Sequence, residues 1–385
     1  MTLVSPNLLQ GVARRSRAAL IAGVLVVVQA ASSNVFAASQ TWDNGTGSFI
    51  WNNKGTDKNW AGKAWTNGND AIFGSTGVGT IKVDATGIGG TTANSITINA
   101  AGYTFNQNTG SDSLTLVGSG LITTNSNVTF NVPIGGSVGL TKAGTATLML
   151  SGANTYTGTT TINAGTLKLD NNNTTTARLV NTSGITVNSG GTLLLAQTGV
   201  VSTDRINNAA GVTISGGGIV ATGGLSEGTR PTSSSATNGA AGMGALTLQT
   251  TSSVSRATID FLTGANGSTL AFSSLVGGNG AFLDIKNWTG TAYTDNGATG
   301  NDRLLFGVDP GLTAAQLANV RFFDDSGAFI GAGEIIGYGN MFELVAVPEP
   351  STWMAAALAL GAIGFSQRKR LSVCASSAVK TIFDF

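Results

Sequence analysis

Acidic side chains are the residues of this 385-residue chain with the best chemistry for acid–base work, because the chain has no histidine. Without histidine there is no Ser-His-Asp or Cys-His catalytic arrangement and no imidazole metal ligand. A glycosidase needs two carboxyl groups held about 5–9 Å apart. Residues 38–347 contain three glutamates, Glu227, Glu334 and Glu343, and scattered aspartates, with no clear cluster of carboxyl groups. The sequence therefore predicts that the protein is not an enzyme and has no cofactor.

Aspartates offer two further candidates for a site. Asp324 and Asp325 are adjacent, but neighbouring side chains on a strand face opposite sides of a sheet. The segment TDNGATGND, around Asp295 and Asp302, contains oxygen ligands suited to Ca²⁺ but lacks calcium-loop spacing. We interpret it as a polar turn and predict no metal site.

The composition indicates an all-β protein. The chain has 55 Gly and 6 Pro, is 41% hydrophobic and only 10% charged. Disordered segments are rarely this apolar, whereas many glycines suit a chain of short strands and tight turns. The single cysteine, Cys374, excludes an internal disulfide. Residues 38–347 contain 13 basic and 17 acidic residues, and this acidic balance argues against nucleic acid as a partner.

The N-terminus has the pattern of a secretory signal. The basic segment ARRSR precedes the apolar run Ala18–Val28, and NVFA then ends at Ala37. A basic region, an apolar core and a small-residue cleavage site in this order are typical of a signal peptide. We predict a signal peptide over residues 1–37, cleaved by signal peptidase after Ala37.

The C-terminus has a short apolar segment followed by charge. Trp353–Phe365 would make about 20 Å of helix, less than the roughly 30 Å hydrocarbon core of a bilayer. Trp353 is placed as an interfacial anchor. The basic residues that would stop transfer and stay cytoplasmic are Arg368, Lys369 and Arg370. Pro348 and Pro350 favour an extended backbone before this transmembrane helix.

The whole segment VPEPSTWMAAALALGAIGFSQRKR resembles the PEP-CTERM sorting signal, which has the same three parts in order. The resemblance implies recognition by an exosortase, a membrane-embedded transpeptidase-like enzyme, and cleavage near the motif. It makes Pro348, Glu349 and Pro350 the recognition residues. We expect a sorting signal over residues 348–370 and assign no role to the tail 371–385.

Repeated strand patterns fill the body of the chain. SITINAAGYTF, TTINAGTLKL, GITVNSGGTLLL and GVTISGGGIV each alternate apolar and polar residues around a glycine turn. In such a unit Leu167 and Leu169 point inward, while Thr166 and Lys168 point outward. Stacked units would bury the apolar faces, and we expect a β-solenoid over residues 74–256. A β-sandwich is the alternative with the same strand pattern.

Residues 139–169, GLTKAGTATLMLSGANTYTGTTTINAGTLKL, resemble the autotransporter-associated β-strand repeat. The matching positions are Leu140, Lys142, Gly144, Leu148, Leu150, Gly152, Asn154, Tyr156, Gly158, Ile162, Gly165 and Leu167. The resemblance implies a right-handed parallel β-helix, similar to pectin-lyase-type solenoids and autotransporter passengers.

Three features bear on the ends and faces of this solenoid. Four tryptophans within residues 38–73 fit either a sugar-stacking platform or an aromatic cap, and we favour the N-terminal cap. Residues 257–347 are expected to form a C-terminal β closing region, with one short helix in TAAQLANV capped by Thr313. The threonine run at Thr159 is not repeated at a fixed spacing, so no threonine array for ice binding is predicted.

Together these patterns predict a secreted bacterial surface or extracellular-matrix protein with a structural or adhesive role. We expect it to be anchored transiently in the inner membrane of a Gram-negative-type bacterium and then moved to the cell surface or matrix. The expected partners are signal peptidase and an exosortase, and exopolysaccharide is a candidate ligand. The alternative is a carbohydrate-active or carbohydrate-binding β-helix protein of lyase type.

Overall fold

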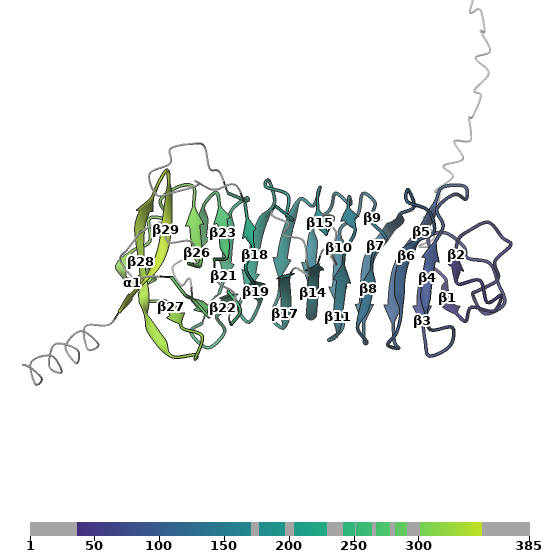
Figure 1. Cartoon of the computed structure of the whole chain (residues 1–385), viewed down its shortest axis with the longest axis horizontal. Helices are drawn as coiled ribbons and strands as arrows, with labels where there is room; N and C mark the ends of the chain where they lie inside the picture. Colours follow the sequence, from purple (N-terminus) through teal and green to yellow (C-terminus); the bar gives the residue numbers. More distant parts are fainter. Residues whose placement is uncertain are drawn as a thin grey trace, which may run out of the picture. The chain divides into compact units, whose positions relative to one another are not determined.

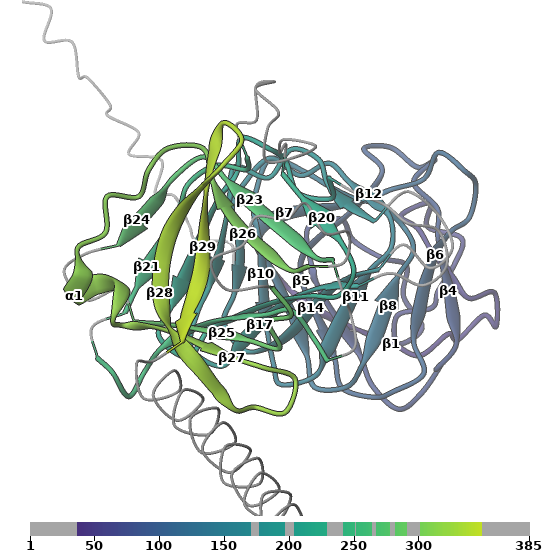
Figure 2. The same cartoon turned by 60° about the vertical axis from the view of Figure 1, so that its left-hand side comes forward.

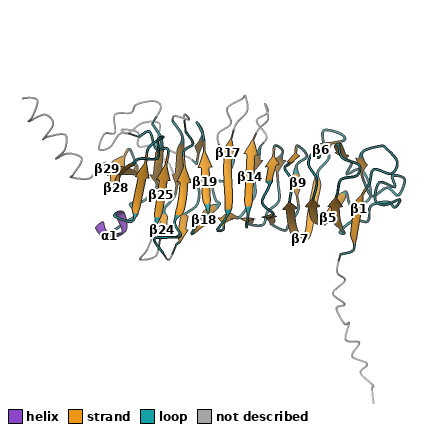
Figure 3. Ribbon diagram, turned by 90° about the horizontal axis from the view of Figure 1, so that it is seen from below, coloured by secondary structure: helices purple, strands orange, loops and turns teal. Residues whose placement is uncertain are grey.

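The computed structural model describes residues 37–170, 177–196, 204–228, 242–250, 252–263, 267–277, 282–290 and 301–348. Strands form almost all of the regular structure in these residues, which confirms the all-β prediction. The strands follow one another in chain order along one axis (Figure 1). The helix α1 (Ala314–Leu317) lies near one end and is purple in Figure 3.

Two long sheets run along this axis. Sheet A contains, in spatial order, β1 (Ser39–Trp42), β3 (Asp70–Phe73), β5 (Thr91–Ile98), β7 (Leu114–Thr124), β10 (Leu140–Ala143), β13 (Thr160–Ile162), β16 (Gly184–Val187), β18 (Gly211–Ser215), β21 (Leu246–Gln249) and β24 (Leu275–Gly277), with β9 (Ile134–Gly135) beside β7. Sheet B contains β2 (Ile50–Trp51), β4 (Thr80–Val83), β6 (Thr104–Gln107), β8 (Val128–Phe130), β11 (Thr147–Leu150), β14 (Gly165–Asp170), β17 (Gly191–Ala196), β19 (Ile219–Thr222), β22 (Ala257–Asp260), β25 (Leu283–Lys286), β27 (Val320–Phe323), β28 (Phe329–Tyr338), β29 (Met341–Pro348), β26 (Arg303–Phe306), β23 (Thr269–Phe272) and β20 (Ser226–Glu227). A separate two-stranded sheet pairs β12 (Ala153–Asn154) with β15 (Arg178–Leu179).

The pairing pattern is that of a parallel β-solenoid. Over most of its length the chain passes from a strand of sheet A to one of sheet B and back, and each strand pairs with the strand of the next coil. These pairs are parallel, whereas antiparallel pairs among the described strands are confined to β26–β29, β27–β28 and β28–β29. The sandwich alternative is wrong, because it needs two antiparallel sheets. The right-handed sense of the coil stays a prediction.

The core is a set of in-register apolar ladders inside the coils. On sheet B one ladder joins equivalent inward positions of seven coils: Leu148, Leu167, Leu193, Val220, Ile259, Ile285 and Phe322. Every member is at most 4% exposed. The predicted directions hold in β14, where Leu167 and Leu169 are buried while Thr166 and Lys168 reach the surface. Alternation within a strand thus becomes a continuous core only because the coils stack in register.

Two glycines of the 139–169 repeat are required by close approach between coils. Gly144 and Gly165 have φ values of +77° and +65°. A Cβ on Gly144 would lie 2.3 Å from the Thr124 carbonyl oxygen, and one on Gly165 would lie 2.5 Å from the Gly144 carbonyl oxygen. A residue with a side chain would therefore be strained and would push neighbouring coils apart.

The N-terminal end is closed by aromatic side chains. Trp42, Trp51, Trp60 and Trp65 are at most 3% exposed and pack on one another and on Phe73. A sugar-stacking platform needs exposed ring faces, and these rings have none. The parallel ladder also starts earlier than the expected solenoid 74–256, because β1 already pairs with β3.

The C-terminal end combines further coils with a hairpin. Parallel pairing continues past residue 257 as far as β27, so the expected closing region 257–347 holds solenoid coils as well. The hairpin β28–β29 then pairs with β27 through β28 and with β26 through β29 (Figure 2). The predicted helix cap is confirmed, because Thr313 and Gln316 form a reciprocal capping box at α1.

Candidate functional site

The first residue of the Pro-Glu-Pro motif is part of the folded sheet. Pro348 is the last residue of β29 and lies opposite Gly331 of β28. The β26 ladder on the other side of β29 covers only residues 342–344, so no neighbour there needs an N–H from Pro348. Proline lacks that N–H and is tolerated at such a strand end. The motif therefore begins where the sheet ends, without an intervening linker.

The remaining predicted sorting residues lie outside the described part of the chain. These are Glu349, Pro350, Trp353, Arg368, Lys369 and Arg370. The described residues include no helix with the length and hydrophobicity needed to cross a bilayer. At the other end, Ala37 is the first described residue, and β1 begins two residues later at Ser39.

A buried ion pair holds the hairpin to the preceding coil. Arg303 Nη1 of β26 donates to Glu343 Oε2 of β29 at 2.7 Å, and both side chains are about 5% exposed. The Arg303 guanidinium also lies 4.3 Å from the ring centre of Tyr338 on β28. One arginine thus connects β26, β28 and β29, the last of which leads into the Pro-Glu-Pro motif.

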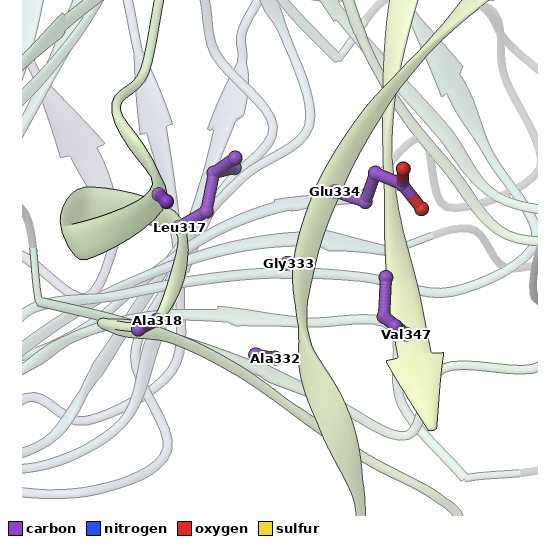
Figure 4. Close-up of a pocket in the computed structure, with 7 residues that line it drawn as sticks. Leu317, Ala318, Ala332, Gly333, Glu334 and Val347 are labelled. Carbon is purple, nitrogen blue, oxygen red and sulfur yellow. The ribbon is translucent and has the colours of Figure 1, made fainter. Parts of the chain in front are cut away.

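A shallow pocket lies beside Val347, the residue before the Pro-Glu-Pro motif. It has a volume of about 320 Å³ and lies between α1 and the hairpin. Figure 4 shows Leu317 on the helix side and Glu334 and Val347 on the two strands opposite. Glu334 is the one carboxylate in its lining, so the pocket has no carboxyl pair for glycoside hydrolysis.

The other candidate carboxylates bind backbone groups of their own chain. Glu227 is fully buried and accepts from the backbone N–H groups of Arg205 and Ile206, and burial raises its pKa to about 7. Asp302 accepts from the N–H groups of Ser268 and Thr289, and burial raises its pKa as well.

Three aspartate candidates remain, and one of them, Asp325, is exposed in the turn that follows β27. Asp324 accepts from the N–H groups of Ser326 and Ala328 and so closes a turn. Asp295 lies outside the described residues. Across the residues that the structure describes, no group of three acidic or cysteine side chains is placed to hold a metal ion.

Lys142 is a buried cation. The sequence pattern identified it as a matching position of the repeat but gave it no function. Its ammonium donates to the carbonyl oxygens of Ala143, Gly144 and Ala164 at 2.7–3.0 Å. These bonds join the Gly144 turn to the next coil. Burial lowers the pKa of Lys142 to about 8. The lysine therefore acts as a shared donor for three carbonyl oxygens of two neighbouring coils.

Sheet A carries a row of threonines that the spacing of the sequence did not reveal. Thr141, Thr161, Thr186, Thr213 and Thr247 occupy equivalent outward positions in five successive strands. We call this row the threonine ladder. The local signal was present, since a threonine sits at the centre of LTK, TTI, ITV, VTI and LTL.

Comparison with known proteins identifies two segments. The PEP-CTERM protein-sorting motif matches residues 346–370. The chain carries this sorting motif. The passenger-associated-transport repeat matches residues 140–169, which confirms the second resemblance. Both matches fall on the segments that the sequence patterns had singled out.

One curated relative also matches. The adhesin BmaC autotransporter of Brucella suis biovar 1 (strain 1330) is 32% identical over 178 residues. This match covers 43% of the present chain and 5% of that adhesin, so it relates the chain to a small part of a much longer protein. No solved structure matches the chain significantly.

Proposed function

We propose that this protein is exported to the bacterial cell surface, where it has a structural or adhesive role, and that an exosortase processes its C-terminal motif. The sorting motif at residues 346–370 supports the export route. The passenger repeat and the similarity to part of an autotransporter adhesin support a role on the outside of a Gram-negative cell.

The observation that carries the proposal is the position of Pro348. This residue is both the last residue of β29 and the first of the Pro-Glu-Pro motif. The ion pair of Arg303 and Glu343 fixes β29 to the solenoid. An exosortase would therefore work directly at the end of the folded body, and cleavage there would release an intact solenoid with its core undisturbed.

The alternative of a carbohydrate-active enzyme has less support. Its catalytic centre would need carboxylates that converge on one open groove. Glu227 and Asp302 are instead buried and engaged with backbone groups, and Glu334 stands alone in its pocket. The solenoid is therefore better suited to present an extended surface than to carry out hydrolysis.

Mass spectrometry of both ends of the exported protein tests this proposal. In a host with an exosortase, we expect the mature chain to begin at Ala38 and to lack residues 368–385. In the same host without its exosortase, we expect the protein to stay in the inner membrane with its C-terminus intact. An intact C-terminus on surface protein from the first host would contradict the proposed processing.

A further inference from the structure

The threonine ladder is a regular feature of the outer surface of the solenoid. Its five members are joined pairwise in register from β10 to β21. Coils of a parallel solenoid are about 4.8 Å apart, so the row is about 19 Å long. Each threonine is half-buried between two buried residues of its strand, and no hydrogen bond of its hydroxyl is found within the described residues. The row thus presents evenly spaced hydroxyl and methyl groups.

The surroundings of the ladder make it a line rather than a plane. On one side, Gly184 and Gly211 are paired in register and have no side chains. On the other side, the Asn188 amide donates to Asn163 Oδ1 at 2.7 Å and accepts from the Ser215 hydroxyl at 3.2 Å. These amides already bond to one another along the axis. In the other three strands the position of Gly184 and Gly211 holds Gly139, Thr159 and Ala245. The hydroxyls of the ladder therefore form a single file beside a row of small residues.

This face has no charge. The one charged residue in β10, β13, β16, β18 and β21 is Lys142, which points inward and is fully buried. The outward face of sheet B differs, because Lys168, Asp260 and Lys286 lie on its strands. A charged polymer would find no opposite charge on the ladder. A neutral partner could bind there without removing water from any charged side chain.

We propose that the threonine ladder binds an extended neutral polysaccharide of the β-1,4-glycan type, lying parallel to the solenoid axis. Such a chain advances by one hexose at a step close to the coil spacing, so successive rings meet successive threonines. Its hydroxyls match the threonine hydroxyls, and its C–H faces match the methyl groups. The small residues beside the ladder leave room for the rings. This inference names the ligand class for the adhesive role in the proposed function, and it rests on that proposal for its setting.

Calorimetric titration of the full chain in mild detergent tests the assignment, with cellohexaose as the probe. We expect cellohexaose to bind at least about tenfold more tightly than cellobiose, because it spans more of the ladder. We also expect the anionic hexamer of galacturonate to bind more weakly than cellohexaose. Absence of cellohexaose binding, or tighter binding of the galacturonate hexamer, would overturn the proposal. Thermal hysteresis without glycan binding would instead indicate ordered water as the ligand and would also overturn it.

Matched variants locate the binding face. Thr186→Lys in β16 should weaken cellohexaose binding at least about tenfold. Gly184→Val adds bulk beside the ladder without removing a hydroxyl and should act in the same direction. Its φ is not left-handed, and the nearest atom to its new Cβ is 3.6 Å away, so a Cβ at this position makes no close contact. Thr192→Lys is the control, since Thr192 is an outward threonine of the same coil on sheet B.

The control should bind within about twofold of the wild type. Wild-type binding by Thr186→Lys, or an equal loss in Thr192→Lys, would refute the assignment to sheet A, with unchanged thermal unfolding showing that each variant is folded. Export and C-terminal processing are measured separately on the same variants and should not change. Normal processing without cellohexaose binding refutes this inference alone, and binding without processing refutes the proposed function alone.

Discussion

Arg303 and Glu343, 40 residues apart in sequence, form a buried ion pair with 2.7 Å between Nη1 and Oε2. The pair connects β26, which pairs in parallel with β23, to β29, the strand that leads into the sorting motif. It lies at the C-terminal end of the solenoid. Unfolding of the strands there would expose the core to solvent.

Removal of one partner of this pair should destabilise the protein strongly. Arg303→Met leaves the Glu343 carboxylate buried without its cation, and such losses cost about 3–5 kcal/mol. The double variant Arg303→Met/Glu343→Leu should recover most of this free energy of unfolding. Lys54→Met is the control, because the Lys54 side chain is 39% exposed and Asp84 keeps the bonds from the Thr86 N–H and hydroxyl. It should cost less than about 1 kcal/mol in denaturant titrations. Equal losses in Arg303→Met and Lys54→Met would contradict the role of burial.

Gly165 should be far less replaceable than Gly190, although both have positive φ values. Gly190→Ala has no atom within 4 Å of the new Cβ, so only backbone strain of about 1–2 kcal/mol is expected. Gly165→Ala meets the Gly144 carbonyl oxygen at 2.5 Å and should cost about 1–3 kcal/mol more. Thermal or denaturant unfolding measures the difference. Similar stabilities of the two variants would show that neighbouring coils can separate at this turn at little cost.

Lys142 should make stability depend on pH in the alkaline range. Its pKa is lowered by burial from 10.5 to about 8 in the folded protein. Between these values the unfolded chain binds a proton that the folded chain has released, so the free energy of unfolding rises with pH. Lys142→Met lacks this contribution. Tyr103, whose pKa burial raises to about 12, contributes equally to both proteins. Denaturant titrations at pH 7–10 should therefore show the wild type gaining stability relative to the variant, and parallel profiles would count against the lowered pKa.

Pro348→Ala/Pro350→Ala should block C-terminal cleavage and leave the protein in the inner membrane. The fold should tolerate the change, because Pro348 lies at the very end of β29. Membrane fractionation and an intact-mass measurement report the outcome, and an unchanged melting temperature is the control. A fully processed double variant at the cell surface would show that the prolines serve only as a spacer.

Replacement of Arg368, Lys369 and Arg370 by serine should loosen the membrane anchor. The orientation of a short apolar segment depends on positive charge at its cytoplasmic end. We expect unprocessed protein in the soluble exported fraction, which an antibody against the tail 371–385 detects by immunoblot. Normal cleavage in this variant would mean that the basic cluster has no part in retention.

The sequence by itself determined the local features of this protein. Alternation placed Leu167 and Leu169 inside and Lys168 outside, and both the Thr313 cap and the segments of the two matched motifs were correctly located. Each of these depends on residues within one strand, one helix end or one contiguous segment. The interactions that determine them join residues close in sequence, so a linear pattern is enough to predict them.

The tertiary structure decided everything that depends on register between coils. The threonine ladder is spaced 20, 25, 27 and 34 residues apart, because the loops between strands differ in length from coil to coil. No fixed period reveals such a row. The threonine run at Thr159 therefore could not be recognised as part of it from the sequence. Parallel pairing beyond residue 257 was hidden for a related reason, since an alternating strand has the same pattern in parallel and antiparallel sheets. Only backbone hydrogen bonds between coils fix which residues become neighbours, and these determine the surface that a ligand would meet.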